Sequence, residues 1–217
     1  MIVVIQCAAS KRPDAGHLIT SGGRPINFVA HPELAPTQDN RLYARPDDIS
    51  ENGMSWRAKL WNYNKSQKDN PLRLWPAYKL YKNKAYGLLV NRFGLESVYI
   101  LSAGWGLIRS DFPTPYYDIT FSQSADPYKR RRRTDRYDDF RMIPDGVKDE
   151  ILFIGGKDYL PLFCQLTNKT EGKRVAFFNS ANVPRFEGCV FKRFETRTQT
   201  NWHYECANAL LSGRVHL

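Results

Sequence analysis

Five short segments of the chain are almost continuously apolar and rich in β-branched or aromatic residues, and they constrain the fold more than any other feature. Strands that are buried on both faces of a parallel sheet have this composition, whereas a strand with one face in water alternates apolar and polar residues. We therefore predict an α/β fold, in which a single domain over residues 1–217 has a mainly parallel central sheet flanked by helices. The predicted strands cover residues 2–6, 98–101, 151–154, 175–178 and 190–194.

Three stretches outside these segments have helical character. The strongest, residues 77–93, has aromatic and apolar residues at spacings of three and four and is followed by Gly94, a typical helix stop. A second helix is predicted over residues 158–166. A third is predicted over residues 203–211, with Asn201 as its N-cap. Helices therefore alternate with strands, as a parallel sheet requires.

The net charge and the hydropathy of the chain indicate a folded protein with a polyanionic partner. The chain carries 32 Lys and Arg residues against 22 Asp and Glu residues, and 42% of its residues are hydrophobic. This composition supports a folded core and excludes a largely disordered chain, and the excess of positive charge favours a polyanionic partner such as DNA. No apolar run approaches the roughly 18 residues of a membrane span, and the first run ends at Gln6, too early for a signal peptide. We expect a cytoplasmic protein with no membrane partner.

The cysteines, Cys7, Cys164, Cys189 and Cys206, are scattered along the chain. They form no C-x-x-C pair and no Cys/His spacing of a zinc site. A catalytic thiol is not favoured, because no histidine lies near Cys7 in the sequence. We expect mostly buried thiols, no metal and no cofactor.

Two further segments stand out by length and by charge. Residues 16–53 show no sustained periodicity, and a connection of this length is usually functional. We predict an insertion loop or lid there, lying over the carboxyl edge of the sheet. Residues 122–145 form a basic segment with interleaved tyrosines, which favours contact with phosphates over a merely solvated surface. The residues predicted to bind DNA are Lys129, Arg130, Arg131, Arg132, Arg133 and Arg136.

Polar, small and aromatic residues follow each predicted strand. Ligands of open parallel sheets bind beyond the carboxyl ends of the strands, so these residues should converge on one crevice. Each has a simpler interpretation as a turn, a helix cap or a half-buried side chain. The candidate substrate-binding residues are Gln6, Ser10, Lys11, Ser102, Trp105, Tyr117, Gly155, Gly156, Asp158, Asn179, Asn201 and Trp202.

The segment from Ile100 to Asp118 contains Ile-Leu-Ser-Ala-Gly-Trp-Gly-Leu-Ile, followed by Asp111 and by Pro-Tyr-Tyr-Asp. It resembles the signature of the YaaA-like superfamily, and residues 5–11 and 81–88 resemble flanking parts of the same group. The resemblance implies a basic, DNA-binding cleft of the kind found in peroxide-stress proteins. Related small proteins are linked with glycosylases that excise modified bases in defence against phage. Residues 16–53 have no counterpart in that group, which favours a specialised role.

A DNA glycosylase needs a carboxylate beneath the sugar and a hydrogen-bonding group near the departing base. Asp118 is the first candidate because it closes the signature, with Asp111 and Asp158 as the other candidates. His203 is the candidate group that protonates the departing base or forms a hydrogen bond with it. We expect Asp118 and His203 to share a pocket walled by Trp105 and Gln6. A non-catalytic DNA-binding protein of the YaaA type, and a nucleotide or sugar-phosphate enzyme with a phosphate nest at residues 155–156, are the alternatives.

Overall fold

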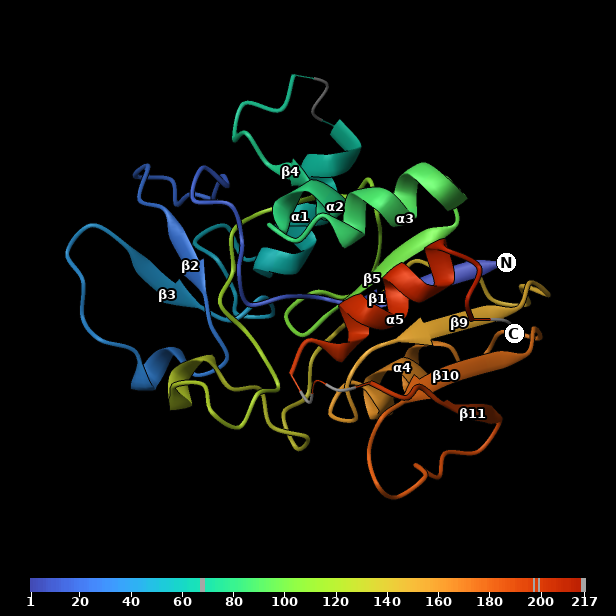
Figure 1. Cartoon of the computed structure of the whole chain (residues 1–217). Helices are drawn as coiled ribbons and strands as arrows, with labels where there is room; N and C mark the ends of the chain where they lie inside the picture. The colour runs from blue at the N-terminus through green and yellow to red at the C-terminus, as the bar shows by residue number, and fades with distance from the viewer. Residues whose placement is uncertain (67–68, 197, 199, 216–217) are drawn as a thin grey trace.

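A seven-stranded sheet forms the centre of the protein, with helices on both of its faces (Figure 1). The structure is a computed structural model, and it describes residues 1–66, 69–196, 198 and 200–215. The order across the sheet is β11-β10-β9-β1-β5-β6-β8. The seven strands are β1 (Ile2–Gln6), β5 (Val98–Ser102), β6 (Gly106–Arg109), β8 (Phe140–Arg141), β9 (Ile151–Ile154), β10 (Arg174–Phe178) and β11 (Cys189–Arg193).

The sheet is parallel except at one pair. β1 lies at the centre and runs parallel to both β5 and β9, and only β5 and β6 pair in antiparallel fashion among the described strands of this sheet. The residues of β1, β5 and β9 are buried almost throughout, as their continuous apolar sequences predict. The predicted α/β class, with a mainly parallel central sheet between helices, is therefore confirmed.

The five predicted strands are present within one residue of their expected ends, but two features differ from the prediction. β11 is an edge strand with partly exposed side chains, and Val190 is 44% exposed, so it is not buried on both faces. β6 and β8 were not predicted. β6 follows β5 after a tight turn inside the signature segment, and β8 has only two residues, too few for a periodic pattern.

The helix predicted over residues 77–93 is interrupted. Tyr81 is extended, with φ −91° and ψ 140°, and it forms an antiparallel bridge with Lys11. This tertiary pairing overrides the helical spacing at that point. Asn201 stands at the N-cap position of α5 as predicted, with φ 63°, but its side chain makes no capping hydrogen bond. The helices are α1 (Trp56–Ser66), α2 (Ala77–Leu80), α3 (Ala85–Phe93), α4 (Leu160–Leu166) and α5 (Trp202–Leu211).

Residues 16–53 carry short elements of their own and lie beyond the carboxyl end of β1 (Figure 1). Phe28 of this segment is fully buried and packs edge-on against Trp56 and Trp105. These apolar contacts join the segment to the hydrophobic core. Its elements are β2 (Ile26–Phe28), which pairs with β3 (Leu42–Ala44), and the short 3-10 helix η1 (Pro32–Leu34).

Two further small elements lie elsewhere in the chain. The strand β4 (Trp75–Pro76) pairs with β7 (Pro113–Thr114), and the 3-10 helix η2 (Pro127–Lys129) directly precedes the arginines at residues 130–133.

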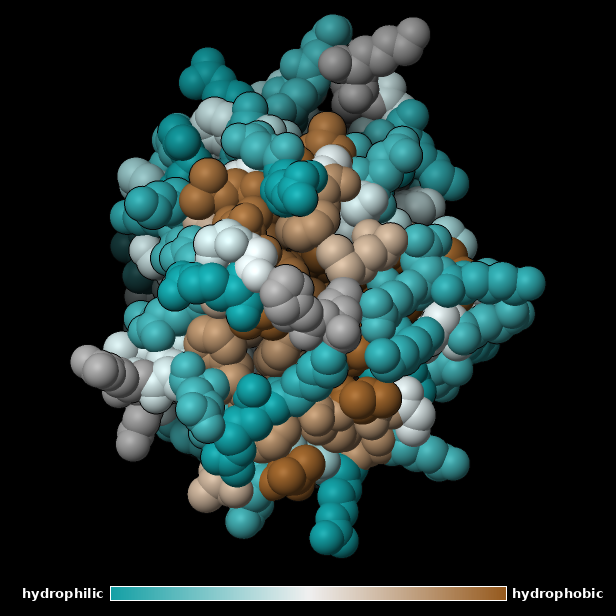
Figure 2. All heavy atoms as spheres, turned by 45° about the vertical axis from the view of Figure 1, so that its right-hand side comes forward, coloured by the Kyte–Doolittle hydropathy of each residue, from teal (hydrophilic) through white to brown (hydrophobic). Residues whose placement is uncertain are grey.

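The face drawn in Figure 2 is mostly hydrophilic, and hydrophobic residues show on it in separate patches. Large hydrophobic side chains that are exposed on the protein include Ile49, Val183 and Leu34. In the described part of the chain, no helix combines the length and the hydropathy needed to cross a lipid bilayer.

Candidate functional site

A pocket of about 920 Å³ opens at the carboxyl ends of β1 and β9. The strand order reverses between these neighbours, because the chain proceeds outward from β1 to β5 on one side and from β9 to β10 on the other. Ligands of open α/β sheets bind at such a reversal, and the volume is in the range of ligand sites. This pocket is therefore the candidate functional site.

Gln6, the last residue of β1, connects the two strands at this point. Its Oε1 accepts a hydrogen bond from the N–H of Gly156 at 2.6 Å, which fixes the orientation of the amide. Gln6 Nε2 is then the donor toward Nε2 of His203, at 3.5 Å, so the imidazole carries its proton on Nδ1. Gly155 permits this approach, since a Cβ there would lie 2.3 Å from the ring of Phe153 and 3.1 Å from Cβ of Gln6.

His203 lies in the first turn of α5 and is buried at the pocket wall. Burial lowers the pKa of His203 from 6.5 to about 4. The imidazole is therefore neutral at neutral pH, where it donates and accepts hydrogen bonds but does not act as a protonated acid. The buried position of His203 therefore favours a hydrogen bond from the imidazole to a bound ligand over the transfer of a proton to that ligand.

Asp158 is the acidic side chain that lines this pocket. It lies in the turn between β9 and α4, its side chain is 36% exposed, and its Oδ1 is 3.8 Å from Nη2 of Arg133. Asp158 and the buried Arg131 also border a second, smaller cavity of about 360 Å³. The other arginines that line it are Arg130, Arg132 and Arg133. We refer to these three arginines as the basic rim. The candidate site thus has a carboxylate, and a positively charged cavity adjoins the site at that carboxylate.

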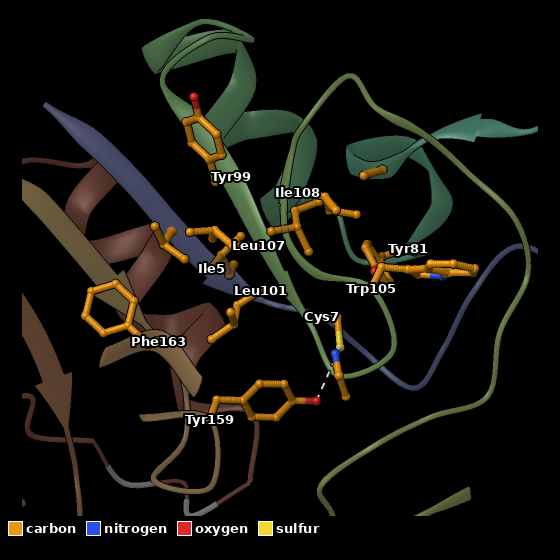
Figure 3. Close-up of a cluster of buried hydrophobic side chains, with 14 of the residues drawn as sticks. Ile5, Cys7, Tyr81, Tyr99, Leu101, Trp105, Leu107, Ile108, Tyr159 and Phe163 are labelled. Carbon is orange, nitrogen blue, oxygen red and sulfur yellow. Dashed lines mark hydrogen bonds between the residues drawn. The ribbon is translucent and has the colours of Figure 1, made fainter. Parts of the chain in front are cut away.

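Cys7 lines the pocket although it is only 3% exposed. The hydroxyl of Tyr159 is 3.2 Å from Cys7 Sγ and points toward it in Figure 3, and the N–H of Ala103 donates to the same sulfur at 3.5 Å. Phe121 packs edge-on against Tyr159, with ring centroids 5.0 Å apart. These residues form an aromatic and sulfur-containing inner wall.

Two of the three predicted carboxylates lie elsewhere. Asp118 does not line the pocket, and its Oδ2 is 3.1 Å from Nζ of Lys129. Asp111 lies at the amino end of β5, on the opposite edge of the sheet, because β6 runs antiparallel to β5. The prediction that Asp118 and His203 share a pocket is therefore wrong, and Asp158 is the predicted carboxylate that lines the same pocket as His203.

Trp105 is fully buried and is not part of the pocket wall, contrary to the prediction. Its ring lies among the buried side chains drawn in Figure 3, edge-on to Phe28 with centroids 5.0 Å apart. Ser102 is also buried, and its Oγ accepts hydrogen bonds from the N–H groups of Gly104 and Trp105 at 3.2 and 3.0 Å. Ser102 therefore holds a turn, and Trp105 fills the core.

Two buried arginines bind the carbonyl groups of the same turn, residues 103–105. Arg131 donates to the first carbonyl at 2.9 Å, and Arg57 donates to the other two at 3.0 Å each. Asp139 lies 2.6 Å from Arg131, and Asp47 lies 2.5 Å from Arg57. Paired charges and backbone hydrogen bonds thus fix the turn.

Tyr117 and Lys11 are buried as well, and neither lines the pocket. The Tyr117 hydroxyl is 2.7 Å from that of Tyr81. Lys11 Nζ lies 4.1 Å from the centre of the Tyr117 ring and donates to the carbonyl of Ala8 at 3.2 Å. Burial lowers the pKa of the Lys11 ammonium group. Both residues stand within the core and not on the surface of the site.

The remaining predicted residues divide between the pocket and its surroundings. Asn179 does not line the pocket. Trp202 is 4% exposed, and its ring stacks on Phe194 with centroids 6.2 Å apart. Residues 197 and 199, in the segment before Trp202, lie outside the described residues. The predicted residues that do line the pocket, besides Gln6, Asp158 and His203, are Ser10, Gly156, Asn201 and Trp202.

The predicted basic strip is not one continuous surface. Arg131 is buried and binds Asp139, which corrects its predicted role as an exposed phosphate contact. Lys129 bridges Asp118 and Asp126 at 3.1 and 2.9 Å. The arginines of the strip with surface exposure are Arg130, Arg132, Arg133 and Arg136.

Several lining residues were not predicted from the sequence. Residues 120–124 form one wall, and none of residues 16–53 lines the pocket, so the predicted lid does not cover it. Lys82 and Asn83 contribute from the break between α2 and α3. The Ser-Gln-Ser run at residues 122–124 was a usable signal, whereas residues 82–83 were hidden inside an expected helix.

The described residues contain no group of three or more His, Cys, Asp or Glu side chains placed to hold a metal ion. No protein-family model, curated protein or solved structure matches the chain. The pocket itself must therefore carry any conclusion about function.

Proposed function

We propose that the pocket binds a nucleotide extruded from a DNA strand and that the protein cleaves the N-glycosidic bond of a modified base, as in defence against phage. The observation that carries the proposal is the convergence of Asp158, Gln6 and His203 on one pocket, with the smaller cavity that the basic rim lines adjoining it at Asp158. An enzyme that acts on a base must remove it from the stack, hold its edge and grip the neighbouring phosphates. The site has a group for each task.

Each group has a defined part in this mechanism. Asp158 stabilises the oxocarbenium-like sugar and orients the attacking water. His203, neutral at neutral pH, forms a hydrogen bond with the departing base. Phe121 and Tyr159 provide aromatic surface inside the pocket, and the basic rim binds phosphates. The bond from sugar to base breaks, water supplies the hydroxyl group on the sugar, and the base leaves with a proton.

A non-catalytic DNA-binding protein is the second candidate, and one observation favours it. Asp118 is paired with Lys129 outside the pocket, so the carboxylate that closes the signature does not stand beside His203. The basic rim alone would suffice for binding DNA. The third alternative, a nucleotide or sugar-phosphate enzyme with a phosphate nest at residues 155–156, is weakened because the Gly156 N–H already donates to Gln6.

The catalytic proposal is tested with Asp158→Asn on unmodified and hypermodified phage DNA. We expect the wild-type protein to release base and leave abasic sites on one modified DNA, and the variant to lose about a hundredfold or more of that rate while still binding DNA. Asp138→Asn, at an exposed carboxylate outside the pocket, is the matched control. Full activity of Asp158→Asn would reject this carboxylate, and DNA binding without base release by the wild type would favour the second candidate.

The DNA-binding part is tested by replacing the three arginines of the basic rim with glutamine. The slope of log affinity against log salt should fall by about 0.9 for each duplex phosphate that the variant no longer neutralises. The matched control replaces Lys148, Lys169 and Lys173 with glutamine, because these lysines are partnered by Asp145, Glu150 or Glu171 away from the pocket. An equal change of slope in both triple variants would show only a net-charge effect.

A further inference from the structure

Cys164 and Cys189 form a close pair of thiols away from the candidate site. Their Sγ atoms are 3.3 Å apart, and both side chains are half-buried. Cys164 lies on α4 and Cys189 begins the edge strand β11, so a bond between them would join a helix to the last strand of the sheet. Sequence spacing did not point to this pair, because the two cysteines are 25 positions apart in the chain.

Arg174 holds the backbone on both sides of the pair. Its Nη1 donates to the carbonyl of Cys164 at 3.3 Å, and its Nε donates to the carbonyl of Gly188 at 3.1 Å. The guanidinium packs closely over Gly188, whose φ is 71°, and a Cβ there would lie 2.2 Å from Nη2 of Arg174. Arg174 thus positions the two cysteine-bearing segments before any covalent bond is formed.

We propose that Cys164 and Cys189 are a thiol–disulfide exchange site, at which a low-molecular-weight disulfide of the glutathione type oxidises the pair. The Cys189 thiolate attacks one sulfur of the disulfide, forms a mixed disulfide and releases one thiolate. Cys164 then attacks Cys189 Sγ, forms the Cys164–Cys189 bond and releases the second thiol with its proton. Two protein thiols and one disulfide become one protein disulfide and two small thiols, so electrons and atoms balance.

The electrostatics of the pair support this order of attack. The hydrogen bond between the two sulfurs, together with the nearby Arg174 charge, lowers the pKa of Cys189 to about 7. The same hydrogen bond and burial raise the pKa of Cys164, which therefore remains a thiol until the mixed disulfide forms. A thiolate near neutral pH is the reactive partner in exchange. Among the described residues no third His, Cys, Asp or Glu completes a metal site here.

The test treats the full chain with oxidised glutathione, quenches with an alkylating reagent and maps the peptides by mass. We expect a peptide cross-linked through Cys164 and Cys189, with no glutathione retained. Cys164→Ser should retain one glutathione on Cys189, and Cys189→Ser should remain almost unmodified at Cys164. Glutathione retained on Cys189 of the wild type, or both thiols alkylated after treatment, would overturn the proposal.

Positioning by Arg174 is tested separately, with Arg174→Met. Intramolecular cross-linking should slow by about tenfold, and the mixed disulfide on Cys189 should become detectable, because the second step depends on the alignment of the two segments. A circular dichroism spectrum matching the wild type shows that the variant is folded. A cross-linking rate equal to that of the wild type in such a folded variant would reject the positioning role.

Discussion

The turn at residues 103–105 and the pocket at the carboxyl ends of β1 and β9 are neighbours with opposite characters. In the turn, Arg57 and Arg131 are buried against paired carboxylates, and their hydrogen bonds end on the protein itself. In the pocket, Asp158 is partly exposed, and Arg132 and Arg133 of the adjoining basic rim are exposed. The charged groups of the turn are all paired within the protein, whereas the pocket region leaves charged groups accessible to a ligand.

This difference shows that a recognisable motif need not mark the reacting groups. The turn contains the most distinctive sequence of the chain, yet its side chains pack the core and fix a backbone conformation. The pocket is built from strand ends and from residues 120–124, which carry no strong motif. Substitutions in the turn should therefore change stability, and substitutions of the exposed residues of the pocket should change binding and activity.

The largest effect expected from this comparison is on Arg131. Arg131→Met leaves Asp139, whose side chain is 3% exposed, without its partner. Breaking a buried ion pair from one side costs about 3–5 kcal/mol, and we expect a loss of that size in the free energy of unfolding by urea. Arg132→Met, at the next and exposed position, should change it by no more than about 0.5 kcal/mol. Equal losses in both variants would abolish the proposed distinction between buried and exposed arginines.

The next effect concerns acid stability. Burial lowers the pKa of His203 to about 4 from 6.5, so the unfolded chain binds this proton more readily than the folded protein. His203 therefore contributes no penalty above about pH 6.5, and stability is lost as the pH falls from there toward 4. The loss attributable to this residue by pH 4 is on the order of 3 kcal/mol.

The variant His203→Gln isolates this contribution, because it removes the titration and keeps an amide that can contact Gln6. The difference in unfolding free energy between wild type and variant, measured by urea titration at several pH values, should change through the range from 6.5 to 4. A difference that is constant over that range would show that His203 is not held neutral by burial.

The smallest effect compares two serines that both follow strands. Ser102→Ala leaves two buried N–H groups without their acceptor, which costs about 1–3 kcal/mol. Ser10 is exposed at the pocket, so Ser10→Ala should change the unfolding free energy by less than about 0.5 kcal/mol. Thermal unfolding of the two variants side by side measures this contrast. A stability loss confined to Ser10→Ala would reverse the assignment of the two serines.

The strands of the sheet were the most predictable part of the protein. Continuous apolar runs such as residues 2–6 have few alternatives to a strand buried on both faces, and the structure confirms them. The helix predicted over residues 77–93 was wrong at residue 81, because Tyr81 pairs with Lys11, a residue distant in sequence. Periodicity records the local preference of the chain and does not record such a pairing.

The candidate site was predictable only in part. Gln6, Gly156, Asp158 and His203 were expected at one edge because parallel strands end there together, and the structure does place them around one pocket. Which carboxylate lines the same pocket as His203 depended on the direction of β6 and on the partner of Asp118. Neither is visible in the spacing of residues along the chain.

The sequence alone determined the α/β class, the mainly parallel sheet and the gathering of polar residues at its carboxyl edge. The reason is that local hydrophobic patterning dictates which segments become strands. The tertiary structure decided which polar residues are buried and paired within the core and which remain accessible to a ligand. Arg131 and Arg132 are chemically identical neighbours, and only packing makes Arg131 a buried partner of Asp139 while Arg132 stays exposed.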